Sequence, residues 1–273
     1  MLILAGTPIG NIGDASARLS LTLEEAKVIA AEDTRTLLKL ANHLGIKLSA
    51  ELISLNEQNE LQKIDRLVEI ATTGNLVLVS DAGMPTISDP GFALVRACSE
   101  QGIEIQVVPG PSSVIAALAV SGLSTDRFSF EGFIPRKSGE RKKFFQKLAT
   151  EVRTMIFFES PHRVTESLED AVTVFGGKRK ASLSRELTKK FEETIRGTLA
   201  ELVELSNDLK GEMVLVVAGA EQAAIAPEDL VNQVLELRAQ GSSLKDAARA
   251  IASQNGASTS ELYDLALKAK PSS

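Results

Sequence analysis

The sequence is poor in several residue types, and each shortage excludes a class of protein. It has one cysteine, two histidines, one tyrosine and no tryptophan. Cys98 cannot form an intrachain disulfide, and with only His43 and His162 beside it no zinc cluster can be assembled. No apolar run reaches the roughly 20 residues of a membrane-spanning helix, and MLILAGTPIG lacks the basic leader of a secretory signal. We therefore expect a reduced, cytoplasmic protein with no structural metal and no membrane partner.

The composition is that of an ordinary globular protein, but its charges are unevenly distributed. The 273 residues are 44% apolar and carry a net charge of −6, which argues against a polyanionic partner. Two segments are nevertheless basic, with Arg136, Lys137, Arg141, Lys142, Lys143 and Lys147 in the first and Lys178, Arg179, Lys180, Arg185, Lys189 and Lys190 in the second. Because remote acids are screened beyond a Debye length of about 8 Å, each segment is either a solvated face or a site of phosphate contact.

The hydrophobic pattern predicts an α/β protein with two lobes and a small helical module. Strand-like runs alternate with helical stretches over the first 110 residues, which is typical of a mostly parallel sheet. One of these helices is expected to begin at Pro90. We expect an N-terminal lobe over 1–114, a second α/β lobe over 115–220, a linker at AAIAPED, and a helix-turn-helix-like module over 226–273.

Two polar loops follow buried strands, where parallel sheets bind ligands. In SDAGMPTISDPG (80–91), Gly83 and Gly91 permit close approach of a ligand to the backbone. The alternative is a rigid connector in which Asp89 only caps the next helix. In VVPGPSS (107–113), either Ser112 or Ser113 is an N-cap, or its hydroxyl binds a ligand together with the free N–H groups of the helix start.

Four further segments carry polar residues in a pattern that allows either chemistry or simple structure. TPIGNIGD (7–14) matches neither GxGxxG nor a P-loop, and EDTR (32–35) is compatible with a surface ion pair. FFESPHR (157–163) ends a strand with Glu159 and opens a helix with His162, which is a site or a structural pair. SRELTKKFEE (184–193) is a second cluster of charge or a salt-bridged surface.

These motifs together resemble one family. TPIGNIGD, AEDTR, SDAGMPTISDPG, VPGPSS, SGL, FEGFIPR, FFESPHR, SRELTKKFEE and EMVLVVAG occur in the family's order and span residues 2–219. The chain resembles the bacterial 16S ribosomal-RNA (cytidine-2′-O)-methyltransferases of the tetrapyrrole methylase superfamily. The resemblance implies a homodimer that binds S-adenosylmethionine (SAM) between two α/β lobes and methylates the ribose 2′-oxygen of a cytidine in the decoding region of 16S rRNA.

The resemblance also implies site residues. The cofactor positions carried over by motif are Ser80, Asp81, Ala82, Gly83, Met84, Ser112, Ser113, Phe158, Glu159, Ala218 and Gly219. The residues expected around the target ribose and its phosphates are Glu159, His162, Arg163, Arg185, Glu186 and Lys189. The base that takes the hydroxyl proton is one of Glu159, His162, Glu186, Lys189 and Asp14.

Two other functions compete with rRNA methylation. The first is a methylase of a small tetrapyrrole-type molecule, but the chain has Ser80-Asp81-Ala82 where porphyrin-modifying relatives have a G-D-P loop followed by Y-G-T-G. The second is a non-catalytic RNA-binding protein that has kept the fold. The intact polar loops argue against that alternative.

Overall fold

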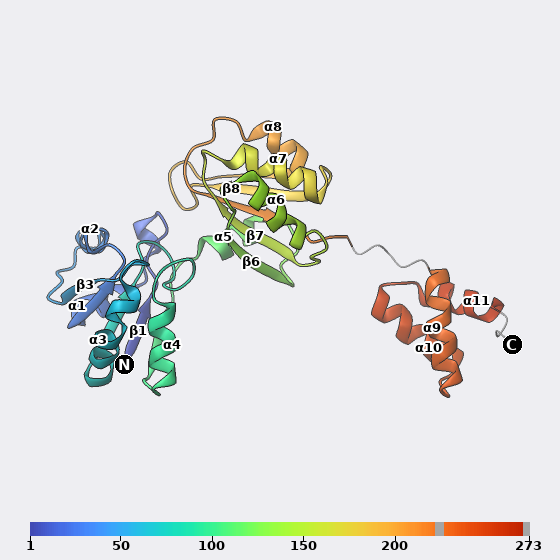
Figure 1. Ribbon diagram of the computed structural model, residues 1–273, viewed down its shortest axis with the longest axis horizontal. Coiled ribbons are helices and arrows are strands. Elements are labelled where there is room, and N and C mark those ends of the chain that lie inside the picture. The colour runs from blue at the N-terminus through green and yellow to red at the C-terminus, as the bar shows by residue number, and fades with distance from the viewer. Residues whose placement is uncertain (222–226, 270–273) are drawn as a thin grey trace. The chain divides into compact units, whose positions relative to one another are not determined.

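A computed structural model describes residues 1–221 and 227–269 of the chain. It has two compact units, 1–219 and 220–273, and Figure 1 labels many of the elements of each. Residues 223–226 of the predicted linker, the predicted start of the module at residue 226, and Lys270 lie outside the described residues.

The first unit begins with a five-stranded parallel sheet. Its strands are β1 (Leu2–Ala5), β2 (Val28–Ala31), β3 (Glu51–Ser54), β4 (Leu76–Val79) and β5 (Ile105–Val108), in the order β3-β2-β4-β1-β5. Helices α1 (Ala17–Glu25) and α2 (Thr34–Leu44) cover one face, and α3 (Glu60–Thr73) and α4 (Phe92–Glu100) cover the other. Because every strand is parallel, the loops after β1, β2, β4 and β5 emerge at one edge of the sheet.

The second sheet has five strands of mixed direction. They are β6 (Phe128–Phe133), β7 (Thr154–Glu159), β8 (Lys180–Arg185), β9 (Glu193–Thr198) and β10 (Met213–Val217), in the order β6-β7-β10-β8-β9. Only β6 and β7 pair in parallel. The main core lies under α6 (Ser138–Lys147), α7 (Val164–Phe175) and α8 (Leu199–Leu205), and α5 (Ser113–Ser121) packs on the opposite face.

The second unit is helical, and its helices share a core of their own. In its described part, α9 (Pro227–Ala239), α10 (Leu244–Asn255) and α11 (Thr259–Lys268) bury Leu230, Val234, Ile251 and Leu262 against one another, with Tyr263 packed at the margin. The predicted fold class, two α/β lobes followed by a helical module, is confirmed. In the described ranges no helix has the length and apolar character required to cross a membrane.

The helix predicted to start at Pro90 begins instead at Phe92. Gly91 is its N-cap residue, with φ at +117°, a conformation that a β-carbon would strain. The N–H groups of Gly91 and Ala93, at the start of the helix, both donate to the carboxylate of Glu60, at 3.0 Å each. The cap therefore comes from the neighbouring helix α3 and not from Asp89.

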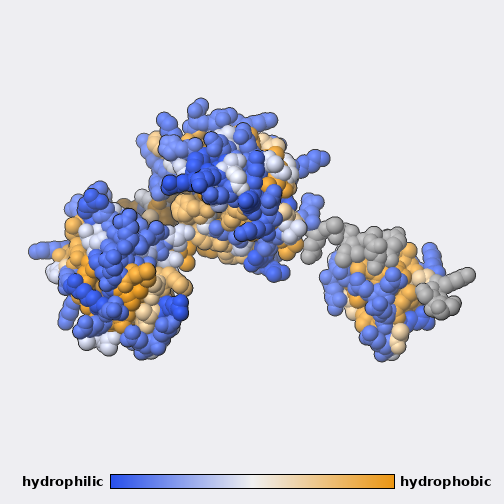
Figure 2. Space-filling model, viewed as in Figure 1, coloured by the Kyte–Doolittle hydropathy of each residue, from blue (hydrophilic) through white to orange (hydrophobic). Residues whose placement is uncertain are grey.

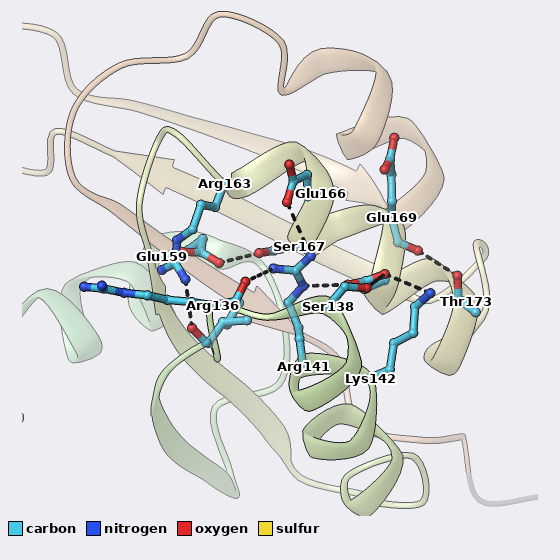
Figure 3. Close-up of polar contacts among 12 residues, drawn as sticks. Arg136, Ser138, Arg141, Lys142, Glu159, Arg163, Glu166, Ser167, Glu169 and Thr173 are labelled. Carbon is cyan, nitrogen blue, oxygen red and sulfur yellow. Dashed lines mark hydrogen bonds and ion pairs between the residues drawn. The ribbon is translucent and has the colours of Figure 1, made fainter.

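The first basic segment contains a structural arginine. Arg141 is 1% exposed, and its Nε donates to the carboxylate of Asp170 at 2.6 Å, while Nη1 donates to the carbonyl of Arg136 (Figure 3). Burial would raise the pKa of Asp170, but hydrogen bonds from Ser138, Arg141 and Lys142 outweigh it and lower that pKa. Of the six cations predicted to form one basic surface, Arg141 is therefore unavailable to a partner, because it ties α6 to α7.

This network makes Arg141 a determinant of stability. Replacing Arg141 with Met leaves the Asp170 carboxylate buried with only Lys142 as its cationic partner, so we expect a loss of about 3 kcal/mol in the free energy of unfolding. The measurement is urea unfolding followed by far-ultraviolet circular dichroism. Lys143→Met removes an exposed lysine from the same helix and serves as the control, with an expected change below about 0.5 kcal/mol. Equal stability of the two variants would contradict this assignment.

Candidate active site

A cleft of about 700 Å³ lies where the carboxyl-end loops of the first sheet meet the second sheet. Its volume is within the range typical of sites for small molecules and cofactors. The residues that line it from the first sheet's loops and α5 are Ile9, Glu32, Asp81, Ala82, Gly83, Met84, Ile87, Asp89, Ser112, Ser113 and Val114. Those that line it from the second sheet and its loops are Phe133, Phe158, Glu159, Ser160, Pro161, Glu186, Leu187, Lys189, Gly211, Glu212, Met213 and Val214.

The floor of the cleft is built by loops that approach one another at backbone distance. Thr7 and Gly83 exchange both backbone hydrogen bonds, at 2.9 and 3.1 Å, which joins the loops after β1 and β4. A β-carbon added to Gly110 would lie 2.6 Å from the carbonyl carbon of Gly6, so the loops after β1 and β5 need glycine at this contact. Gly83 has φ at +82°, a further reason for glycine in this floor.

Three carboxylates face the cleft from the first sheet. Glu32 follows β2, and Asp81 and Asp89 belong to the loop after β4. Partial burial, reinforced by the charge of Glu32, raises the pKa of Asp89 to about 6. Burial also raises the pKa values of Asp81 and Glu32, and each is raised further by a neighbouring carboxylate. This wall of the cleft is therefore short of positive charge and is suited to a cationic ligand.

The EDTR segment fixes one of these carboxylates. Asp33 and Arg35 form the expected exposed ion pair, at 2.6 Å. The side chain of Asp33 also accepts from the Arg35 N–H and caps α2, while its own backbone N–H donates to Asp81 at 3.0 Å. The motif thus does more than form a surface pair, because it orients Asp81 at the cleft.

Ser112 and Ser113 lie at the N-terminus of α5 and line the cleft. Ser112 is the N-cap residue, but its side chain makes no capping hydrogen bond. The first N–H groups of the helix therefore lack a side-chain cap and lie beside two hydroxyls, an arrangement that suits a carboxylate or hydroxyl of a ligand.

Glu159, at the end of β7, is fully buried and its carboxylate is held on both oxygens. One oxygen accepts from Arg163 at 2.5 Å and from the Ser160 N–H at 2.7 Å, and the other accepts from the hydroxyl of Ser167 (Figure 3). These donors tie the strand end to the start of α7. The geometry suits Glu159 to positioning this wall more than to accepting a proton from a substrate.

A second polar group comes from the loop after β8. Lys189 Nζ donates to Glu186 at 3.0 Å and to Glu212 at 2.7 Å, and all three residues line the cleft. Burial lowers the pKa of Lys189, but the hydrogen bonds to Glu212 and Glu186 outweigh it and raise that pKa. The hydrogen bond from Lys189 lowers the pKa of Glu186 in turn. The Lys189 ammonium is thus held between the carboxylates of Glu186 and Glu212.

The structure brings most of the predicted residues together and leaves seven outside the lining of the cleft: Asp14, Ser80, His162, Arg163, Arg185, Ala218 and Gly219. Ser80 is buried beneath the loop, His162 is exposed, and Arg185 pairs with Glu193 at 2.7 Å. Ala218 and Gly219 follow the far end of β10, roughly 16 Å along the strand from Met213. Ala218 and Gly219 lie away from the cleft because β10 runs antiparallel to β7. The first residues of β10, and not its last, therefore lie beside the end of β7 at the cleft.

Sequence reasoning did not single out several residues that line the cleft. Glu32 lay in a named motif but was given no role, and Glu212 precedes a buried strand, a position that carries no periodic signal. The second basic segment is also divided, since Lys178 and Arg179 precede β8 and Lys180 begins it, while Lys189 and Lys190 follow it. Among residues 1–221 and 227–269, no three His, Cys, Asp or Glu side chains are arranged to hold a metal ion.

Comparison with known proteins shows the family to which the chain belongs. The sequence model of the family described as Tetrapyrrole (Corrin/Porphyrin) Methylases matches residues 1–203. The chain belongs to this family. It is 44% identical to the ribosomal RNA small subunit methyltransferase I of Mycobacterium tuberculosis (strain CDC 1551 / Oshkosh), over 98% of this chain and 95% of that protein. The protein of the same name from Escherichia coli O157:H7 is also 44% identical, over 98% and 94%. The resemblance drawn from the motifs is confirmed.

Solved structures of the tetrapyrrole methylase fold align with 80% of the chain. The methyltransferase CobJ is 20% identical with a TM-score of 0.60, over 94% of its own length. Uroporphyrin-III C-methyl transferase from Thermus thermophilus, solved with S-adenyl homocysteine, is 17% identical with a TM-score of 0.56, over 96% of its length. At these identities the likeness establishes the fold.

Because the pKa of Asp89 is raised, the free energy of unfolding should depend on pH. The folded chain favours the protonated carboxyl, so the wild type loses stability as pH rises from about 4 to about 6 and stays lower above that. Asp89→Asn removes this penalty, and we expect it to be more stable by about 1 kcal/mol at pH 7, a value reduced because the side chain is partly exposed. Urea unfolding at several pH values measures the difference, which should vanish near pH 4.

Asp126→Asn provides the control, because it removes an exposed aspartate that does not line the cleft. Its stability should follow the wild type at every pH. A gain from Asp89→Asn that is the same at pH 4 and pH 7 would show that the carboxyl carries no burial penalty.

Proposed function

We propose that the cleft transfers a methyl group from SAM to small-subunit ribosomal RNA, at the ribose 2′-oxygen of a cytidine in the decoding region. The observation that carries the proposal is the 44% identity, over nearly the whole chain, to proteins named as rRNA small subunit methyltransferases. A ribosomal substrate agrees with the cytoplasmic location expected from the sequence. The homodimer implied by the motifs remains part of the proposal.

The chemistry of the cleft fits SAM. The methyl donor is a sulfonium cation that also carries an ammonium group, and the carboxylates of Glu32, Asp81 and Asp89 supply the negative wall that such a ligand favours. Its carboxylate and ribose hydroxyls match Ser112, Ser113 and the N–H groups of the α5 terminus. When bound, SAM supplies the methyl group, and the backbone of Ala82, Gly83 and Met84 offers the close approach that positions it.

Methyl transfer also requires removal of the proton from the 2′-hydroxyl. Both oxygens of Glu159 are already engaged by donors, so we assign it, with Arg163, to positioning. The next candidate for the base is the polar group formed by Lys189, Glu186 and Glu212. We propose that the carboxylate of Glu186 or Glu212 takes the proton while Lys189 stays protonated. Glu212 is the more accessible of the two, with 81% of its side chain exposed. His162 and Arg185 are proposed as contacts to RNA phosphates at the cleft border.

Ribose-methylation mapping of 16S rRNA tests the function. Small subunits from a strain lacking this protein should lack one 2′-O-methyl group in the decoding region, and the purified chain with SAM should restore it. Methylation elsewhere in the rRNA would overturn the site specificity. SAM binding with methyl transfer only to a tetrapyrrole would favour the small-molecule alternative, and RNA binding without SAM binding would favour the non-catalytic one.

The role of Lys189 is tested by a pair of neighbouring lysines. Lys189→Met removes the cation between Glu186 and Glu212, and we expect kcat to fall by about 100-fold or more with SAM affinity unchanged. Lys190→Met is the matched control, since Lys190 lies over the ring of Phe191 and does not line the cleft. Calorimetric titration with SAM and single-turnover methylation separate binding from chemistry. Equal rates for the two variants would remove Lys189 from the reaction.

A further inference from the structure

One large apolar side chain of the cleft is exposed to solvent in a way that core packing does not explain. Phe133 lines the cleft and is 62% exposed. It belongs to FEGFIPR, a motif to which the preceding assignments give no role. Exposing a phenylalanine forgoes about 2 kcal/mol of burial, so a position that keeps one exposed at a ligand site calls for a ligand that covers it.

The backbone is built to present this ring. The register of β6 against β7 shifts between Phe130 and Phe133, and Gly132 within the shift has φ at +74°. Such a bulge turns one side chain away from the alternation of the strand, and bulges of this kind are common beside active sites. A β-carbon at Gly132 would meet nothing within 4 Å, so this glycine serves the backbone conformation and not a close contact.

The ring is also held in place from behind. Phe158, at the end of β7, contacts Phe133 edge to face with ring centroids 5.3 Å apart, and it contacts Phe130 in the same manner at 4.8 Å. Contacts of this kind restrict the orientation of a ring, while more than half of the Phe133 surface stays open to solvent. Phe133 is thus a supported aromatic surface at the cleft, and not a loose side chain.

Positive charge lies three residues further along the chain. Arg136 is exposed and forms no ion pair among the described residues, and Figure 3 shows its side chain extending away from the Arg141 network. Its carbonyl oxygen accepts from the buried Arg141, which fixes its backbone. On the face of the second lobe shown in Figure 2, hydrophilic residues cover most of the surface. An exposed aromatic ring, followed three residues later by an exposed arginine, is a combination suited to binding single-stranded nucleic acid.

We propose that Phe133 is the platform on which the unpaired nucleobase of the target nucleotide stacks, with Arg136 contacting the adjoining phosphate. The inference rests on the proposed function and adds to it the residue that recognises the base. Its physical reason is that a 2′-hydroxyl within a folded RNA reaches an enclosed cleft only if its nucleotide is drawn out of the stack. Stacking on an aromatic ring replaces the interactions that the base loses and fixes the ribose beside the cofactor positions.

The absence of tryptophan from the chain permits a direct test. Phe133→Trp, labelled with 5-hydroxytryptophan, places a single reporter at the cleft that can be excited selectively beside ribosomal tryptophans. Phe92→Trp is the matched control, because Phe92 is 67% exposed on α4 and does not line the cleft. Each protein is titrated with S-adenosylhomocysteine and then with unmethylated small ribosomal subunits, with naked 16S rRNA in parallel.

We expect the subunits or the rRNA to quench the reporter at position 133, and S-adenosylhomocysteine alone to leave it unchanged. The reporter at position 92 should respond to neither. Quenching by S-adenosylhomocysteine alone would assign Phe133 to the adenine of the cofactor and overturn the proposal. Absence of quenching in a variant that still methylates rRNA would overturn it as well, while leaving the proposed function intact.

Kinetics give the second measurement. Phe133→Ala should raise the KM for the RNA substrate by roughly 5- to 150-fold, the range found for loss of one base–aromatic stack, with SAM affinity unchanged. Phe133→Tyr keeps the ring and should restore KM to near the wild-type value. A KM unaltered in Phe133→Ala would contradict the platform role. Failure of the wild type itself to methylate rRNA would instead count against the proposed function.

Discussion

The site depends on how closely the first sheet's loops approach one another. Gly6 and Gly110 meet with no room for a β-carbon on either, and Thr7 and Gly83 pair backbone to backbone. These contacts bring the loops after β1, β4 and β5 into one floor. The positions of Asp81 and of the α5 N-terminus follow from that floor, because each is carried by one of these loops. A cleft assembled from rigid backbone contacts needs little reorganisation when a ligand binds.

A similarly close contact joins the loop after β1 to the loop after β8 in the second sheet. The N–H of Asn11 donates to the hydroxyl of Thr188 at 3.0 Å, and a β-carbon at Gly10 would lie 2.5 Å from Cγ of Lys189. Gly10 of TPIGNIGD therefore leaves space for the aliphatic part of the Lys189 side chain, which lines the cleft. This explains a motif whose residues fit no nucleotide-binding pattern, since its role is to accommodate the loop that carries Lys189.

Local patterns in the sequence predicted the helices, the strands and the two polar loops. The structure departs from the predictions where contacts between residues far apart in the sequence decide the arrangement. The burial of Arg141 depends on Asp170, which is 29 residues away on another helix. The N-terminus of α4 is capped by Glu60 on α3, so Asp89 is not needed as the cap and lines the cleft instead. Ala218 and Gly219 were placed at the site by motif, but strand direction brings Met213 and Val214 there instead. Apolar runs reveal strands, but they do not reveal the direction in which a strand crosses a mixed sheet.

The distribution of aromatic residues has a practical consequence for following the folding of this chain. Tyr263, the sole tyrosine, packs against the core of α9–α11, whereas every phenylalanine belongs to the first unit. At the wavelengths of the tyrosine absorption maximum, the absorption of the unmodified protein is therefore weak and arises almost entirely from the helical unit. Melting of the two α/β lobes would pass nearly unseen at the wavelengths of tyrosine. The two units can thus be monitored separately in one experiment, the helical unit by its tyrosine and the lobes by the backbone signal of their sheets.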